Sequence, residues 1–405
     1  MKPIVRARRM KPVHSDIRGP LFVEAMKRQK QGIDILKLNT GNPATFGFGL
    51  PDSIKNALME HMQDSVGYCD FKGMPQARQA IWDYETSKDI KGITSDDVFI
   101  GNGVSEVVSF ALTPLLNDGD EVLVPSPSYS LWGNSIYLEG GKPVFYTCDE
   151  KANWYPDIKD IRSKISDKTK AIVIINPNNP TGVLYPKELL LEIIQIARES
   201  GLLIFADEIY DRLVMDGKQH ISLASLTEDV PVITLNGLSK SHCLCGYRCG
   251  WMVISGPREL TEDYRQGIIQ LTSLRLCANT LAQIVIPAAL DDMDTPASMV
   301  RPGGRIYEQR EATVRELEKI DGLSFVKNDA AFYVFPKLDV KKFNITNDKQ
   351  FAHDLLDATN ILLVPGSGFD WKDPDHFRIV MLPQADILSD AIRRMGTFLD
   401  GYKQK

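Results

Sequence analysis

The chain has 405 residues, of which 43% are hydrophobic and 25% are charged. This is the composition of an ordinary globular protein, and it excludes a disordered chain, a collagen and a disulfide-rich miniprotein. Lys and Arg total 47 against 53 Asp and Glu, which gives a net charge of −6. That balance argues against a dedicated nucleic-acid binder, although it allows a local basic pocket for a small anion. The length predicts two or three domains.

The first residues do not resemble a targeting signal. Residues 1–9 are basic, but no apolar segment follows them, so a secretory signal is not expected. The strongest apolar runs, 171–175 and 202–206, are much shorter than the ~20 residues of a membrane span. We therefore expect a cytoplasmic protein without a membrane partner.

Three of the six cysteines lie close together, at positions 243, 245 and 249, next to His242. Structural zinc sites usually combine one C-x₂₋₄-C pair with a second, distant pair. The sequence has no such second pair. This pattern favours free thiols in a reducing compartment, and we predict no metal site.

Short apolar runs alternate with helical patterns through the middle of the chain. The expected strands each end in polar or turn-forming residues and cover 98–100, 121–124, 171–175, 202–206 and 232–235. Residues 187–199 have the pattern of an amphipathic helix. Continuous apolar strands of this kind predict a parallel sheet that is buried on both faces. Ligands of such sheets bind at the carboxyl ends of the strands.

The pattern changes near residue 302 to that of a smaller α+β unit. The expected helices are 306–320, 350–358 and 385–399, and the expected strands are 323–326, 331–335, 361–364 and 377–381. The segment 1–45 is too short to be a domain, and we expect it to pack on this unit. We therefore predict a large domain at 46–300 and a small domain at 301–405, with an N-terminal arm at 1–45.

Three polar residues follow expected strands, and Arg248 lies eight residues beyond the third of them; each of the four also has an ordinary structural explanation. Asn179 lies in an Asn-Pro-Thr-Gly turn, and Asp207 could either cap a helix or stabilise a cationic nitrogen. Lys240 could lie on the surface, or it could attack carbonyls if a nearby cation lowers its pKa. Arg248, among small residues, could bind a phosphate through its two-pronged guanidinium.

The order and spacing of Asn179, Asp207, Tyr210, Lys240 and Arg248 together resemble fold-type I pyridoxal-phosphate enzymes, in particular the class I/II aminotransferases. The resemblance covers nearly the whole chain. It implies an α/β fold, in which a large domain has a mostly parallel sheet flanked by helices and a small domain is α+β. Within the class, several motifs look most like the bacterial glutamate–pyruvate (alanine) aminotransferases; they are Asp16-Ile-Arg-Gly-Pro20, Leu38-Asn-Thr-Gly-Asn-Pro43, Gly67-Tyr-Cys-Asp70, Ile175-Asn-Pro-Asn-Asn-Pro-Thr-Gly182, Asn236-Gly-Leu-Ser-Lys240 and Asp375-His-Phe-Arg-Ile-Val380.

The resemblance implies a role for each residue around the cofactor ring. Lys240 would hold the aldehyde of pyridoxal phosphate as a Schiff base and, once released by the substrate, would move the proton. Asp207 would keep the pyridine nitrogen protonated. Tyr210 and Asn179 would bind the ring oxygen, and Tyr129 would stack on the ring.

The cofactor phosphate would be bound by a helix start and an arginine. Backbone N–H groups of Val104 and Ser105 suit an anion, and Arg248 would complete that site. In the family, the tyrosine that matches Tyr68 reaches the phosphate from the neighbouring subunit. The resemblance therefore implies a homodimer with a shared active site.

The chain also departs from the family pattern in this region. Many relatives have a serine where this chain has Gly237, so one phosphate hydrogen bond is lost unless Ser239 supplies it. His242 and the three clustered cysteines replace the more usual residues between Lys240 and Arg248.

Arginines are the candidates for binding the substrate. Arg378 matches the family's residue for the α-carboxylate, which a guanidinium can bind through two hydrogen bonds. Gly41 would allow the backbone to approach the substrate. Arg18 is the candidate for the distal carboxylate of glutamate, although a structural role explains it equally well. For Arg275 we favour a structural role.

These inferences predict an aminotransferase that interconverts L-alanine plus 2-oxoglutarate with pyruvate plus L-glutamate, in a ping-pong reaction through the Lys240 Schiff base. One alternative is another pyridoxal-phosphate enzyme: an aspartate, aromatic or branched-chain aminotransferase, or a C–S β-lyase. A second is a regulator, but regulators with this fold carry an added DNA-binding domain, and only 45 residues precede the predicted large domain. The expected partners are small amino and keto acids, with no nucleic acid.

Overall fold

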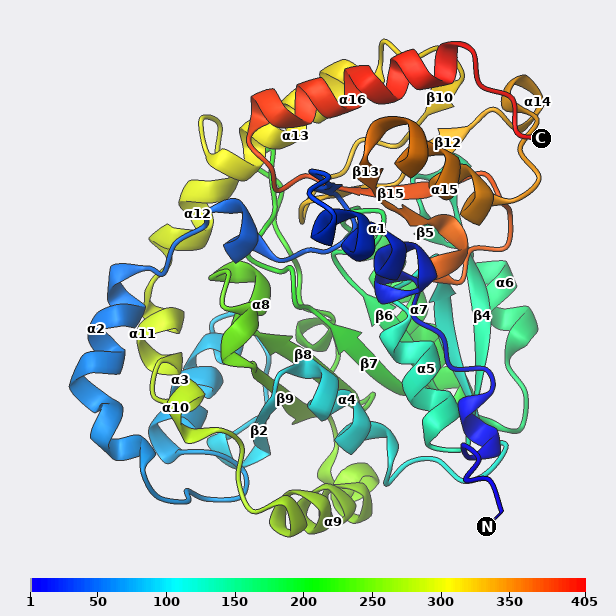
Figure 1. Ribbon diagram of the computed structural model, residues 1–405. Helices are drawn as coiled ribbons and strands as arrows, with labels where there is room; N and C mark the ends of the chain where they lie inside the picture. The colour runs from blue at the N-terminus through cyan, green and yellow to red at the C-terminus, as the bar shows by residue number, and fades with distance from the viewer. Residues whose placement is uncertain (1) are drawn as a thin grey trace.

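The computed structural model describes residues 2–405 and has an eight-stranded sheet at its centre (Figure 1). The order across the sheet is β2-β9-β8-β7-β6-β3-β4-β5. The strands are β2 (Val98–Asn102), β3 (Glu121–Ser126), β4 (Lys142–Asp149), β5 (Tyr155–Pro156), β6 (Thr169–Ile175), β7 (Leu203–Asp207), β8 (Val232–Gly237) and β9 (Cys249–Ser255). β3, β4, β6, β7 and β8 are parallel, whereas β9 is antiparallel to both of its neighbours. The predicted mostly parallel sheet is confirmed. The sequence did not predict that β9 runs antiparallel to its neighbours.

Side chains of each central strand alternate between two apolar layers, because successive residues of a strand point to opposite faces. In β6, Val173 and Ile175 pack toward α4, α5 and α9, whereas Ile172 and Ile174 pack toward α3, α6 and α7. Both faces are therefore covered, as the continuous apolar runs predicted. The helices are α3 (Pro75–Thr86), α4 (Val104–Leu112), α5 (Leu131–Leu138), α6 (Ile158–Lys164), α7 (Lys187–Ser200) and α9 (Arg258–Arg275).

The remaining helices of this part of the chain lie at its edges. α2, α3 and α11 pack together beside the β2 end of the sheet (Figure 1). α8 is a single short helix that follows β8. Their bounds are α2 (Asp52–His61), α8 (Leu238–Ser241), α10 (Thr280–Gln283), α11 (Ile286–Asp291) and α12 (Asp294–Val300).

The C-terminal elements form a second hydrophobic core, and both ends of the chain contribute to it. α13 and α16 lie side by side along the top of Figure 1. β1 pairs with β13 in parallel, which joins the N-terminal segment to this part. The elements are α1 (Pro20–Lys30), β1 (Leu36–Lys37), α13 (Arg305–Leu317), β10 (Leu323–Ser324), β11 (Tyr333–Val334), β12 (Lys337–Leu338), α14 (Val340–Phe343), α15 (Asp348–Thr359), β13 (Ile361–Leu362), β14 (Val364–Pro365), β15 (Phe377–Val380) and α16 (Ala385–Asp400).

The single strand expected at 361–364 is two strands in the structure. β13 pairs with β1, and β14 pairs antiparallel with β15, so the chain changes partners at Leu363. The apolar pattern did not predict the break because Leu363 is as buried as its neighbours. Similarly, only Tyr333 and Val334 of the run 331–335 pair as a strand.

Within residues 2–405, no single helix has the length and apolar character needed to cross a membrane. One pair of helical segments, Arg258–Arg275 and Thr280–Asp291, satisfies those criteria jointly, but the two meet at a bend of 120°.

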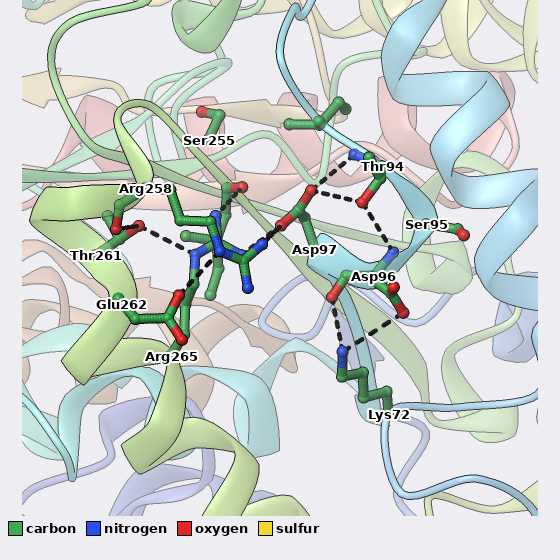
Figure 2. A network of polar contacts seen from close by, with 12 residues as sticks. Lys72, Thr94, Ser95, Asp96, Asp97, Ser255, Arg258, Thr261, Glu262 and Arg265 are labelled. Atoms are coloured by element: carbon green, nitrogen blue, oxygen red, sulfur yellow. Dashed lines mark hydrogen bonds and ion pairs between the residues drawn. The ribbon is translucent and has the colours of Figure 1, made fainter.

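A buried ion pair fixes α9 to the start of β2, as Figure 2 shows. Arg265 Nη1 donates to Asp97 Oδ1 at 2.5 Å, and Arg265 Nη2 donates to the carbonyl of Ile254 at 2.9 Å. The other carboxylate oxygen of Asp97 accepts from the N–H and the hydroxyl of Thr94. The pair therefore connects three segments at the end of the sheet where β2 begins.

We expect Asp97→Ala to lower the free energy of unfolding by about 3–5 kcal/mol, because it leaves the Arg265 guanidinium buried without a counter-charge. Denaturant unfolding measures the loss. The matched control is Asp96→Ala, which removes an exposed carboxylate paired with Lys72 and Arg78, and should change stability by about 1 kcal/mol or less. Equal losses in the two variants would contradict this role of the buried pair.

Candidate active site

One edge of the large sheet collects most of the polar residues singled out in the sequence. β6, β7 and β8 end there, next to Asn179, Asp207 and Lys240 respectively. β9 starts at the same edge because it is antiparallel, with Gly250 opposite Gly237. The direction of β9 therefore brings Arg248 to the carboxyl ends of its neighbours.

Lys240 lies in α8 and is half-buried, with its amine directed toward the N-terminal segment. Its Nζ donates to the carbonyl oxygen of Gly41 at 2.9 Å and lies 3.9 Å from Cys245 Sγ. Burial lowers the pKa of the Lys240 ammonium, but Tyr333, Cys245 and Tyr129 outweigh this, and the net pKa lies above its ordinary value. The lowered pKa expected from a nearby cation is therefore not found, although Arg378 acts in that direction.

Asp207 ends β7 as a buried carboxylate. Its Oδ2 accepts a hydrogen bond from Trp132 Nε1 at 3.0 Å, and no cation lies within ion-pair distance among residues 2–405. Burial raises the pKa of Asp207 to about 6, against the opposing effect of the Trp132 hydrogen bond. A ligand that brings a positive charge to this buried carboxylate would bind favourably, because it would pair with the uncompensated negative charge.

Arg378, in β15, is 1% exposed and carries no carboxylate partner within the described chain. Its Nη1 donates to Asn179 Oδ1 at 2.9 Å, and its Nη2 donates to the carbonyl of Asn39. Its Nε has no hydrogen-bond partner. The guanidinium lies over the rings of Tyr333 and Phe369, 4.6 Å from each centroid. Burial lowers the pKa of Arg378, and the group is a cation prepared to receive an anion.

Tyrosines connect these charged groups. The hydroxyl of Tyr210 lies 2.8 Å from the hydroxyl of Tyr333, and both side chains are buried. Tyr129 is half-buried after β3, close enough to influence the pKa of both Lys240 and Arg378. A Cβ on Gly41 would collide with the Tyr333 hydroxyl, so the glycine permits this close approach.

The sequence analysis did not identify Tyr333, Trp132 or Asn39. Tyr333 lies within an apolar run that was interpreted only as a strand, and Trp132 lies in a helix covering the sheet. Their patterns are those of core residues. Asn39 acts through its backbone carbonyl, which leaves no signature in side-chain identity.

A second group of residues, Gly103, Val104, Ser105 and Arg248, forms a cradle at the start of α4. Gly103 precedes this helix at φ 82°, and the Arg248 guanidinium fills the space where its Cβ would lie. The first residues of α4, Val104 and Ser105, are the ones expected to bind a phosphate. At Gly237, a Cβ would lie 2.6 Å from the carbonyl of Cys249 in β9. The serine that many relatives carry there has no room in this chain.

Two predicted residues lie outside this cluster. Tyr68 is 84% exposed. Arg18 is exposed in a turn whose neighbour, Ile17, accepts a hydrogen bond from the Asn39 side chain at 2.9 Å. Arg275 instead forms an ion pair with Glu106 and donates to the carbonyls of Phe71 and Ile100, which is a structural role.

All six cysteines are free thiols. Among residues 2–405, one group of side chains is close enough to share a metal ion, namely Glu208, Asp211 and His220. The Lys88 ammonium already lies 3.0 Å from Glu208 and 3.4 Å from Asp211. The Lys88 ammonium is therefore already the positive partner of these two carboxylates.

The chain belongs to the class I and II aminotransferases. The sequence profile of that family, described as aminotransferase class I and II, matches residues 33–392. The chain is 50% identical to the glutamate-pyruvate aminotransferase AlaA of Haemophilus influenzae over 404 residues, covering 100% of both chains. Among solved structures, an aminotransferase from Escherichia coli is 46% identical, covers 100% of both chains and has a TM-score of 0.98. The alanine aminotransferase of Pyrococcus furiosus is 40% identical, with a TM-score of 0.93 and coverage of 98% of this chain and 100% of that chain.

Enzymes of this class depend on pyridoxal phosphate and act on amino and keto acids. The residues described here fit such a cofactor and substrate. Asp207 lacks a cation, the Nε of Arg378 lacks a hydrogen-bond partner, and the Arg248 guanidinium lies against Gly103 at the start of α4. A cationic ring nitrogen, a carboxylate and a phosphate are the groups that would satisfy them.

We expect Asp207→Asn to stabilise the cofactor-free protein near neutral pH. Burial raises the pKa of Asp207 to about 6 in the folded protein, whereas its ordinary value is 3.8. Stability therefore falls as pH rises between those values, and the asparagine removes a penalty of about 3 kcal/mol at about pH 8. Its side-chain oxygen can still accept from Trp132. The measurement is the Tm of the cofactor-free protein from about pH 4 to about pH 8.

The matched control is Asp211→Asn, a buried carboxylate whose pKa is lowered by Lys88 despite burial. Its stabilising effect is present at neutral pH and is lost as the pH falls, so this variant should destabilise at about pH 8. A lower Tm for both variants at that pH would contradict the assignment for Asp207.

Proposed function

We propose that this chain catalyses the transfer of an amino group between L-alanine and 2-oxoglutarate, giving pyruvate and L-glutamate, with pyridoxal phosphate as cofactor. The observation that carries the proposal is the buried Arg378 guanidinium, which lacks a carboxylate partner and lies among residues that also surround Lys240. The full-length similarity to enzymes named glutamate-pyruvate and alanine aminotransferase supports the choice of substrates.

The chain offers a complementary group for each part of the cofactor. Lys240 would hold its aldehyde, and Asp207 would face its ring nitrogen. The cradle of Val104, Ser105 and Arg248 would bind the phosphate through backbone N–H groups and a guanidinium. Asn179 and Tyr210 would bind the ring oxygen, and Tyr129 would contact the ring face. When bound, pyridoxal phosphate supplies an aldehyde that exchanges amino groups and a ring that withdraws electrons from the substrate α-carbon.

The protein's own residues then bind the substrate and move its proton. Arg378 would take the α-carboxylate through two parallel hydrogen bonds, in an orientation already fixed by Asn179 and Asn39. The Lys240 amine, which now donates to the Gly41 carbonyl at 2.9 Å, would accept the α-proton at Nζ and return it at the other carbon. Arg18 would pair with the second carboxylate of glutamate.

We further propose a homodimer in which Tyr68 completes the partner's phosphate site. Tyr68 is 84% exposed. Further exposed apolar residues lie in its own segment and in a second segment, and a hydrogen bond from Thr280 to the carbonyl of Ser65 at 2.6 Å joins the two segments. Exposed apolar residues in adjacent segments favour burial against another protein. These residues are Met59, Met62, Val66, Leu274, Leu276 and Leu281.

The predicted domain division remains part of this proposal. Residues 46–300 would provide the cofactor site, and residues 301–405 together with the arm 1–45 would close over the substrate through Arg378 and Arg18. The six free thiols suit a reducing compartment, and we place the enzyme in the cytoplasm.

The first test is a half-reaction. Purified protein loaded with pyridoxal phosphate should release pyruvate when L-alanine is added, and 2-oxoglutarate should then restore the starting absorption spectrum with formation of L-glutamate. Lys240→Ala should still bind the cofactor but lose turnover by a factor of about 10²–10⁴, because the proton carrier is absent. Pyruvate and spectra are measured in parallel.

Two outcomes would contradict the proposal. One is the absence of any half-reaction with alanine or glutamate. The other is pyruvate release together with ammonia and without dependence on 2-oxoglutarate, which would instead identify a β-lyase.

The shared site predicts complementation between two defective chains. Co-expression of Lys240→Ala and Tyr68→Ala chains with different tags allows the mixed dimer to be purified. It contains one intact site, so at limiting cofactor it should show about half the activity of the wild-type dimer. The control mixes Lys240→Ala with Arg378→Ala, which leaves both sites defective. A mixed dimer no more active than its parents would contradict a contribution of Tyr68 across the interface.

A further inference from the structure

His376 is a fully buried titratable side chain next to the proposed substrate site. It is 0% exposed and immediately precedes β15, the strand that carries Arg378. Its Nδ1 lies 2.6 Å from Asp375 Oδ1, and its Nε2 lies 3.5 Å from Glu150 Oε1. Carboxylates face both ring nitrogens, Asp375 within hydrogen-bond distance of Nδ1 and Glu150 at ion-pair distance from Nε2, which makes no hydrogen bond. Two carboxylates on opposite sides of the ring favour its protonated, imidazolium form.

A lysine completes this group of charges. Lys337 Nζ lies 2.8 Å from Glu150 Oε2 and 3.5 Å from Asp375 Oδ2. The four side chains therefore alternate in charge and balance to zero. Glu150 is the member from the large sheet, because it opens the short helix η6 (Glu150–Ala152) directly after β4. The other three belong to the C-terminal elements.

Aromatic rings enclose the imidazole on its remaining sides. Phe335 stacks on it at 4.9 Å between centroids, and Trp154 and Trp371 meet it edge-on at 5.1 and 5.3 Å. These neighbours carry no charge, so Asp375, Glu150 and Lys337 are the charged groups around it. Burial lowers the pKa of His376, but the two carboxylates outweigh burial and raise it above the ordinary value.

Packed aromatic rings also connect the His376 imidazole to Arg378. Phe335 lies 6.0 Å from Phe369, and the Arg378 guanidinium lies 4.6 Å from that second ring. The backbone provides another connection, because the His376 carbonyl accepts the N–H of Gly366 at 2.7 Å. A shift of His376 relative to Glu150 would therefore move β15 and the guanidinium at the same time.

We propose that His376 is a positioning residue for Arg378: the imidazolium, held between Asp375 and Glu150, fixes β15 against the large sheet and so sets the geometry of the substrate carboxylate site. This inference rests on the proposed function of Arg378. His376 contacts neither substrate nor cofactor. Its effect is on substrate affinity, with the chemical step left largely intact.

The test compares purified holoenzymes of wild type, His376→Gln, Glu150→Gln and a control, His353→Gln. His353 is an exposed histidine on α15 that pairs with Asp357 at 3.3 Å. We measure KM for 2-oxoglutarate, kcat, Tm and the Kd of glutarate, an unreactive dicarboxylate. His376→Gln should raise KM and Kd about tenfold or more while kcat changes by less than about threefold, because the carboxylate site is displaced but the proton carrier is not.

The pH dependence separates positioning from a purely structural role. In wild type, the glutarate Kd should rise on the alkaline side as the imidazolium loses its proton. Glu150→Gln removes one carboxylate that holds this proton, so the rise should begin at lower pH. In His376→Gln this step should be absent. If His376→Gln does not fold, Glu150→Gln decides the question, since Glu150 is partly exposed.

A wild-type glutarate Kd in both variants, even with a lowered Tm, would overturn the proposal and leave only a structural role. Failure of the proposed function is seen separately, as a wild-type enzyme that gives no half-reaction with alanine. A similar rise in Kd for His353→Gln would also overturn the proposal, because it would show that loss of any histidine has this effect.

Discussion

The structure depends on holding charged groups in place without neutralising them. Asp207 is bound by a tryptophan N–H, and Arg378 by a side-chain amide oxygen and a backbone carbonyl. All of these partners are neutral. Burying a charge with only neutral partners is unfavourable, so the surrounding fold must supply the free energy. Two buried apolar layers around the sheet, and the second hydrophobic core in the C-terminal elements, supply it.

Much of the sheet edge at which β6, β7 and β8 end could be predicted from the sequence, because ligands of parallel sheets bind at the carboxyl ends of the strands. Asn179, Asp207 and Lys240 each follow an apolar run that forms a central strand. Arg248 is different. It reaches the same edge because β9 is antiparallel, and an apolar run of seven buried residues does not reveal its direction. Arg378 was identified through the family resemblance, since β15 belongs to a separate sheet whose position relative to β7 and β8 depends on long-range packing.

Other residues were missed because burial hides their role. Tyr333 has the pattern of a core residue, and the hydroxyl that meets Tyr210 is a single atom at the end of a side chain that otherwise packs. His376 belongs to a motif that was noted only as a subgroup feature. Its environment comes from η6, β12 and η9 (Gly366–Phe369), which lie far apart in the chain. Sequence periodicity describes neighbours within an element, and these contacts join different elements.

The uncompensated charge of Asp207 has a consequence for the lifetime of the protein. A ligand that pairs with a buried charge lowers the free energy of the folded state but not that of the unfolded state. It therefore reduces the fraction of molecules that unfold. Proteases act on opened chains, and their rate follows that fraction. The abundance of this protein in a cell should therefore follow the supply of its ligand, even when its synthesis is constant. The buried Asp207 carboxylate therefore has a second effect: the protein without its ligand is degraded faster than the protein with its ligand bound.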